Sequence, residues 1–195
     1  MIRAVLFDFD GTLARFSGDR DLSRDLMMDL GLTSVPSNYL EVFRSHEYAP
    51  GPVTFASALR ATLEELKLET KANLDEVAAK FIASYAAQIK PLPDALETLR
   101  YFAHLPKAIL TNGPSDVQRA AIRASGFEDF FQTILVSGDA DVGFAKPHPR
   151  IFELACERLE VAPSEALMIG DNLKLDVQAA LEVGLQAIHK SVSGF

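Results

Sequence analysis

The sequence has little of what disulfide-rich, nucleic-acid-binding or membrane-spanning proteins need. Cys156 is the only cysteine among 195 residues, which excludes a disulfide within the chain and a thiolate metal cluster. The net charge is −8 and no basic block is present, which argues against nucleic acid and anionic membranes as partners. No apolar run approaches a membrane span, and Asp8 interrupts the run after Met1 before a signal-peptide core is complete. These absences predict a cytoplasmic protein.

The first strand-like stretch leads directly into two acids. Residues 4–7 form a continuous apolar run, typical of a strand that is buried on both faces of a parallel sheet. If the chain stays extended, Asp8 and Asp10 point to the same side at the carboxyl end of this strand, where open α/β sheets bind ligands, and Gly11 permits a sharp turn. Two such carboxylates repel each other, and a hard divalent cation such as Mg²⁺ offsets that repulsion. The simplest alternative is a solvated Asp-x-Asp-Gly turn.

The next part of the chain has a helical pattern. Proline and glycine separate its segments, and apolar residues recur at helical spacing within each. We therefore expect an all-helical insertion, a cap over residues 15–90. Its predicted helices cover residues 19–30, 37–47, 53–68 and 73–89.

Strands and helices alternate through the rest of the chain. Such alternation, with short right-handed crossovers, predicts an α/β fold with a mainly parallel sheet and helices on both faces, a Rossmann-like three-layer core. This core consists of residues 1–14 and 91–195. The predicted strands cover residues 107–111, 133–137, 166–170 and 185–189, and the predicted helices cover residues 94–103, 115–125, 149–159 and 173–183.

Polar residues follow several of the predicted strands and should meet at one edge of the sheet. Taken singly, each group is an ordinary turn or surface feature, and a second Asp-x-Asp pair at Asp139 and Asp141 is interpreted as a loop. Taken together and in order, the groups resemble the four motifs of the haloacid dehalogenase-like superfamily, over essentially the whole chain. The motif residues are Asp8-Phe9-Asp10-Gly11-Thr12, then Thr111-Asn112-Gly113, Lys146-Pro147, and Gly170-Asp171 with Asp176.

This resemblance implies phosphoryl transfer through an aspartyl-phosphate. Asp8 corresponds to the nucleophile, and Asp10 to the residue that protonates the leaving oxygen and later deprotonates water. The implied Mg²⁺ ligands are the side chains of Asp8 and Asp171 and the backbone carbonyl of Asp10. Thr111 is expected to bind the phosphoryl group.

The remaining motif residues have supporting roles in this scheme. Asn112 and Gly113 are expected to help Thr111 bind phosphate, and Lys146 to neutralise charge on the nucleophile and the phosphoryl group. Asp176 corresponds to a residue that either orients Lys146 or supports the metal.

The acid at Asp10 favours a phosphate monoester over a carbon–halogen bond, because an alkoxide needs a proton to leave whereas a halide does not. The pattern looks most like small-molecule phosphatases, among them 5′-nucleotidases, phosphoglycolate phosphatases and sugar-phosphate phosphatases. We therefore expect a Mg²⁺-dependent phosphatase for a small phosphate ester, with the cap closing over the substrate. Two alternatives stay open: a phosphomutase with the same aspartyl-phosphate, and a non-catalytic binding or regulatory module of the same fold.

Overall fold

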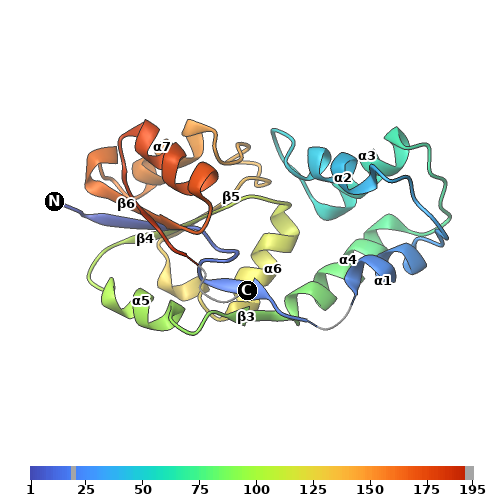
Figure 1. Ribbon diagram of the computed structural model, residues 1–195, viewed down its shortest axis with the longest axis horizontal. Helices are drawn as coiled ribbons and strands as arrows, with labels where there is room; N and C mark the ends of the chain where they lie inside the picture. The colour runs from blue at the N-terminus through green and yellow to red at the C-terminus, as the bar shows by residue number, and fades with distance from the viewer. Residues whose placement is uncertain (19–20, 192–195) are drawn as a thin grey trace.

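A five-stranded, fully parallel sheet forms the centre of the molecule (Figure 1). The computed structural model describes residues 1–18 and 21–191. The strand order is β5-β4-β1-β6-β7, so the strand that precedes Asp8 lies in the middle. The strands are β1 (Ala4–Phe7), β4 (Lys107–Thr111), β5 (Thr133–Val136), β6 (Ala166–Gly170) and β7 (Gln186–His189).

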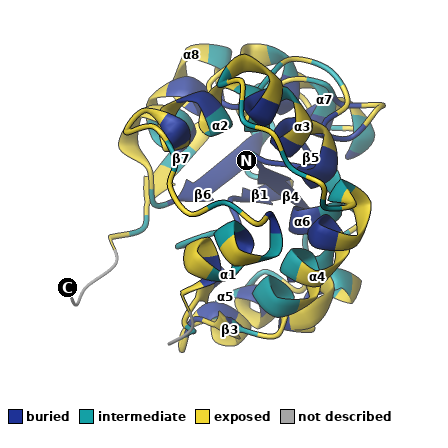
Figure 2. Cartoon of the chain, turned by 90° about the vertical axis from the view of Figure 1, so that its right-hand side faces the viewer, coloured by how far each residue is buried: buried dark blue, intermediate teal, exposed yellow. Residues whose placement is uncertain are grey.

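Alternate residues of the strands pack against helices on opposite faces. On one face, Leu6 and Leu110 pack with residues of α7 (Pro149–Arg158) and α8 (Ala179–Val183). On the other face, Phe7 packs with residues of α5 (Ala95–Tyr101) and α6 (Ser115–Ser125). Figure 2 shows β1, β4 and β6 as buried strands between partly exposed helices. The predicted three-layer α/β fold is confirmed.

The four helices between β1 and the rest of the sheet form a separate group, at the right of Figure 1. Their buried apolar residues form one cluster, which includes Leu26, Phe55 and Val77. Val117 of α6 joins this cluster and so links it to the core. The helices are α1 (Leu22–Asp29), α2 (Tyr39–Glu47), α3 (Phe55–Glu65) and α4 (Leu74–Ala86).

Two short strands that the sequence did not predict connect this group to the core. β2 (Ala14–Phe16) and β3 (Ile89–Pro91) pair antiparallel, with Ala14 opposite Pro91. The expectation of helix up to residue 89 is therefore wrong, because α4 ends at Ala86 and the chain turns at once into β3. In strands of three residues, the alternation of apolar and polar residues that identifies a strand is too short to be recognised in the sequence.

Other predicted elements hold within a few residues, with two qualifications. The expected helix over residues 173–183 divides into a π-helix (Leu173–Gln178) and α8. The helix expected from residue 19 is α1, and positions 19 and 20 lie outside the described residues. Cys156 is buried in the core, as expected. Among residues 1–18 and 21–191, no helix combines the length and apolar character needed to cross a membrane.

Candidate active site

Asp8 lies where β1 ends, at the carboxyl edge of the sheet. Its backbone N–H still donates to the carbonyl of Ile169 in β6 (3.0 Å), so the strand pairing holds its position up to this residue. The residue is 7% exposed, and one of its side-chain oxygens accepts a hydrogen bond from the Thr12 hydroxyl (2.8 Å). The nucleophile expected from the sequence is therefore fixed by the sheet and the turn that follows.

Lys146 joins two of the predicted acids. Its ammonium nitrogen lies 2.7 Å from Asp8 Oδ1 and 2.6 Å from Asp176 Oδ1, and all three side chains are buried. The other oxygen of Asp176 accepts from the backbone N–H of Asn172 (2.9 Å). Asp176 thus contacts the same ammonium group as Asp8.

Three carboxylates form a cluster that suits a hard cation. One oxygen from each of Asp8, Asp171 and Asp176 lies within 4.8 Å of the other two. A single ammonium group, that of Lys146, is paired with two of them, so the cluster has excess negative charge. Oxygen donors with net negative charge are what Mg²⁺ prefers, and the residues present therefore fit this ion.

Gly11 leaves space for this cluster. Its φ of +83° lies in the left-handed region that favours glycine, and a Cβ at this position would overlap the carboxylate of Asp171. The turn after Asp10 thus needs glycine for the backbone conformation and for the approach of Asp171.

Asp10 and Thr111 are joined by a residue that the motifs do not include. Gln118, in α6, accepts from the Thr111 hydroxyl (3.1 Å) and donates to Asp10 Oδ2 (3.1 Å). The side chain of Asp10 is not in the three-carboxylate cluster. This separation gives the two acids of the first motif different partners.

The segment around Lys146 is tied to the end of β4. The Asn112 side chain donates to the carbonyl of Lys146 (2.8 Å) and accepts from its backbone N–H (2.8 Å). Gly113 donates its N–H to the Ser137 hydroxyl (2.9 Å). Asn112 therefore positions the Lys146 backbone, while Thr111 and Asn112 also line the cavity of about 160 Å³ beside Asp8.

Burial and charge shift the pKa values of these groups. Burial raises the pKa of Asp8 to about 6, although Lys146 opposes the shift. Burial also raises the pKa of Asp10 and of Asp171. For Lys146, burial favours the neutral amine, but Asp8 and Asp176 outweigh it and raise the pKa. Both acids of the first motif thus hold a proton more tightly than usual, but only Asp8 is paired with an ammonium group, and such a pair of acids is suited to nucleophilic and acid–base chemistry.

Comparison with known proteins agrees with this geometry. The model of one protein family, the haloacid dehalogenase-like hydrolases, matches residues 2–184. The chain belongs to this family. The match includes every motif residue of the site, from Asp8 to Asp176.

Relatives of this hydrolase differ in the reactions for which they are named. It is 31% identical to the glyceraldehyde 3-phosphate phosphatase of Methanopyrus kandleri, over 96% of this chain and 83% of that protein. It is 43% identical to the phosphoserine phosphatase of Thermus thermophilus, but over 43% of this chain and 33% of that protein. A 2-haloacid dehalogenase of Pseudomonas syringae has a similar structure, with a TM-score of 0.71 and 25% identity over 100% of this chain and 90% of that one.

The helical insertion of this hydrolase brings further residues to the site, which the sequence motifs did not indicate. Tyr48, which follows α2, lines the cavity beside Asp8. Burial and the nearby charge of Asp10 raise the pKa of Tyr85 in α4. Burial raises the pKa of Glu47, at the end of α2, to about 7, with Arg44 opposing the shift and Asp10 adding to it. A helical pattern in the sequence does not show which turn of a helix will lie beside the end of a strand that is distant in the sequence.

Proposed function

We propose that this hydrolase is a Mg²⁺-dependent phosphatase that hydrolyses a small phosphate monoester through an aspartyl-phosphate. The observation that carries the proposal is the arrangement at the end of β1. There Asp8 is paired with Lys146 (2.7 Å), while Asp10 is held separately by Gln118 (3.1 Å). A nucleophile and an acid–base residue two positions apart thus have distinct environments.

In the first half of the reaction, a carboxylate oxygen of Asp8 forms a bond to phosphorus while the bond from phosphorus to the ester oxygen breaks. Asp10 gives its proton to the departing oxygen, and the raised pKa of Asp10 suits this role. In the second half, Asp10 takes a proton from water, whose oxygen attacks phosphorus and releases Asp8 and inorganic phosphate.

The neighbouring groups bind and neutralise the phosphoryl group. The Thr111 hydroxyl and the backbone N–H of Asn112 are the proposed donors to its oxygens, whereas the N–H of Gly113, also expected to bind phosphate, is already donated to the Ser137 hydroxyl (2.9 Å). Lys146 offsets negative charge on Asp8 and on the phosphoryl group. Asp8, Asp171 and the backbone carbonyl of Asp10 are the proposed metal ligands; Mg²⁺, when bound, supplies positive charge that lowers the repulsion between the phosphate and these acids.

The helical insertion is the proposed cap. Residues 15–90 form the cap in this proposal, and residues 1–14 and 91–195 form the catalytic core. The position of Tyr48 at the cavity beside Asp8 supports this division, because Tyr48 comes from the insertion. The small cavity favours a small ester over a macromolecular substrate.

Asp10 also separates this proposal from dehalogenation, the reaction named for the Pseudomonas syringae relative. A halide leaves as a stable anion, whereas an alkoxide needs the proton that Asp10 can give. The hydrogen bond from Gln118 (3.1 Å) holds this carboxyl in the site, which supports ester cleavage.

The test is a panel of small phosphate monoesters and 4-nitrophenyl phosphate, assayed with Mg²⁺ and with EDTA, alongside 2-chloropropionate. We expect Mg²⁺-dependent release of inorganic phosphate and no release of chloride. Asp8→Asn should lower kcat by on the order of 10⁴-fold, because it removes the nucleophile. Asp141→Asn, which changes an exposed acid of the other Asp-x-Asp pair, should leave kcat unchanged.

Three results would contradict the proposal. Chloride release without phosphate release would indicate a dehalogenase. Phosphate transfer to a sugar phosphate, dependent on a bisphosphate activator, would indicate the phosphomutase. Absence of any reaction across the panel would indicate the non-catalytic module.

A further inference from the structure

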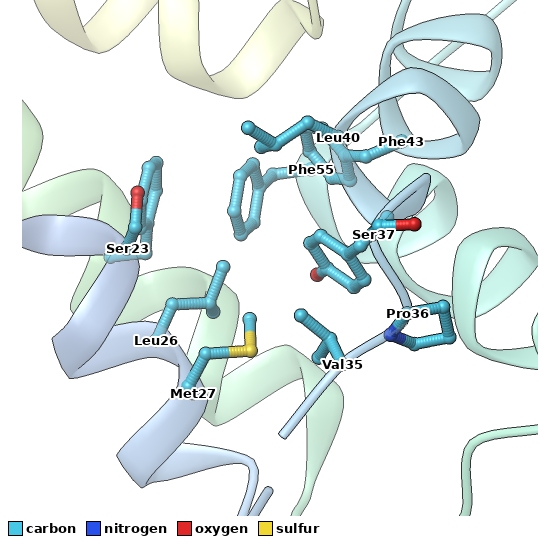
Figure 3. A pocket seen from close by; sticks show the side chains of 11 residues that line it. Ser23, Leu26, Met27, Val35, Pro36, Ser37, Leu40, Phe43 and Phe55 are labelled. Atoms are coloured by element: carbon cyan, nitrogen blue, oxygen red, sulfur yellow. The ribbon is translucent and has the colours of Figure 1, made fainter. Parts of the chain in front are cut away.

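A second cavity of about 430 Å³ lies inside the helical insertion. Figure 3 shows Leu26 and Met27 on one side of this cavity and Leu40, Phe43 and Phe55 on the other. None of its lining side chains, all from the described part of the chain, carries a charge. It shares no lining residue with the cavity beside Asp8. It is therefore a separate, predominantly apolar space.

The hydroxyl group of Tyr39 is the polar feature of this cavity that calls for an explanation. Tyr39 lines the cavity and is 5% exposed. Within residues 1–18 and 21–191, no atom hydrogen-bonds to its buried hydroxyl oxygen. Burial raises the pKa of Tyr39 to about 12, so the hydroxyl keeps its proton at neutral pH and is available as a donor. A buried donor without an acceptor is unfavourable, and a ligand oxygen would relieve this cost.

Flat aromatic surfaces complete the wall of the cavity. The rings of Phe55 and Phe81 are stacked, with centroids 4.1 Å apart and an interplanar angle of 10°. Tyr39 and Phe43 are also parallel, with an interplanar angle of 9°. Parallel rings present planar apolar faces, on which an aromatic or aliphatic group packs well, and Met27 adds an adaptable side chain.

We propose that this cavity binds a neutral, mainly apolar small molecule through one oxygen that accepts a hydrogen bond from the Tyr39 hydroxyl. The volume lies within the range of small-molecule sites. An anion or a cation is excluded as the main ligand, because the lining offers no counter-charge to offset its burial. The proposal does not rest on the phosphatase activity, since the two cavities are lined by different residues.

A matched pair of probes tests the proposed hydrogen bond. Acetophenone and α-methylstyrene have nearly the same shape, but only acetophenone has a carbonyl oxygen. By isothermal titration calorimetry with the full chain, we expect saturable binding of both, with acetophenone about fivefold tighter, the preference typical of one hydrogen bond. Tyr39→Phe should bring the ratio of the two Kd values close to one. Tyr101→Phe, at an exposed tyrosine of α5, should keep the fivefold preference.

A second variant tests the location. Val35 lines the cavity, and Val35→Phe places a ring in its volume, so both probes should lose at least tenfold in affinity. Far-UV circular dichroism and thermal unfolding verify that each variant is folded. Absence of saturable binding to the folded wild type would overturn the proposal. So would a fivefold preference that survives Tyr39→Phe, or full binding by folded Val35→Phe.

Discussion

The edge of the sheet and the helical insertion differ in how completely their side chains are packed and paired. Every residue of β1, β4 and β6 is buried, and Asp8, at the end of β1, hydrogen-bonds to Thr12 and Lys146. In the insertion, α1 and α2 each bury only two residues, and a cavity of about 430 Å³ remains between the helices. The atoms that react must be placed accurately, whereas the region that surrounds a leaving group tolerates looser packing. Substitutions in the two regions test this difference.

Gly11→Ala and Gly31→Ala compare the same backbone change in the two regions. Both glycines have a positive φ, but a Cβ at Gly11 overlaps Asp171, whereas a Cβ at Gly31 has no described atom within 4 Å. We expect Gly11→Ala to lower kcat/KM by on the order of 10²-fold and to weaken activation by Mg²⁺, because Asp171 must move. Gly31→Ala should cost about 1 kcal/mol of stability and leave kcat/KM unchanged. Equal losses of activity would show that activity depends no more on exact packing at the sheet edge than on packing in the insertion.

Glu47→Gln tests whether the burial of an acid of the insertion makes the stability of the protein depend on pH. The pKa of Glu47 is raised to about 7 in the folded protein, so the folded state binds this proton more tightly than the unfolded state does. Its ionisation therefore destabilises the wild type as pH rises from about 4.5 through 7. Glu47→Gln should match the wild type near pH 4.5 and be more stable by on the order of 2 kcal/mol at pH 8.

Urea unfolding at the two pH values measures this difference. Glu41→Gln, at an exposed position of the same helix, provides the control and should alter stability equally at both pH values. A pH-independent effect of Glu47→Gln would show that burial at the end of α2 does not raise the pKa of Glu47.

Gln118→Met tests the support that the core gives to Asp10. The substitution removes the hydrogen bonds to Thr111 and Asp10, and kcat should fall by about tenfold. Because the bond from Gln118 lowers the pKa of Asp10, its loss raises that pKa further. In the proposed mechanism the first step needs protonated Asp10, so the alkaline limb of the kcat/KM profile should move to higher pH. Gln132→Met, which removes a hydrogen bond at the other end of β4, should leave the profile in place.

Tyr85→Phe tests the corresponding support from the insertion. Burial and the nearby charge of Asp10 raise the pKa of Tyr85. Its ring stacks on Phe16 and Phe81, so the phenylalanine should keep its place. We expect kcat to fall by about threefold. Tyr101→Phe is the matched control. A loss larger than that of Gln118→Met would mean that the insertion, and not the core, holds Asp10.

The sequence predicted the sheet and its motif residues because both leave local signals. The strand over residues 107–111 is a buried apolar run, and Thr111 follows it directly. Gln118 left no such signal, because its contact with Asp10 joins residues 108 positions apart. Asp139 was interpreted correctly as a loop residue, but its burial and its ion pair with Arg119 (2.8 Å) depend on how α6 packs beside that loop. Contacts between distant elements follow from packing, which a local pattern does not encode.

The pairing of β2 with β3 has a consequence for how this chain can change over evolution. Ala14 lies opposite Pro91 in an antiparallel pair, so the two ends of the insertion are roughly 5 Å apart. A segment whose ends meet so closely can be shortened, exchanged or grafted without disturbing the register of the parallel strands. The reaction centre and the helices above it can therefore diverge at different rates, as two parts of one gene under separate selection.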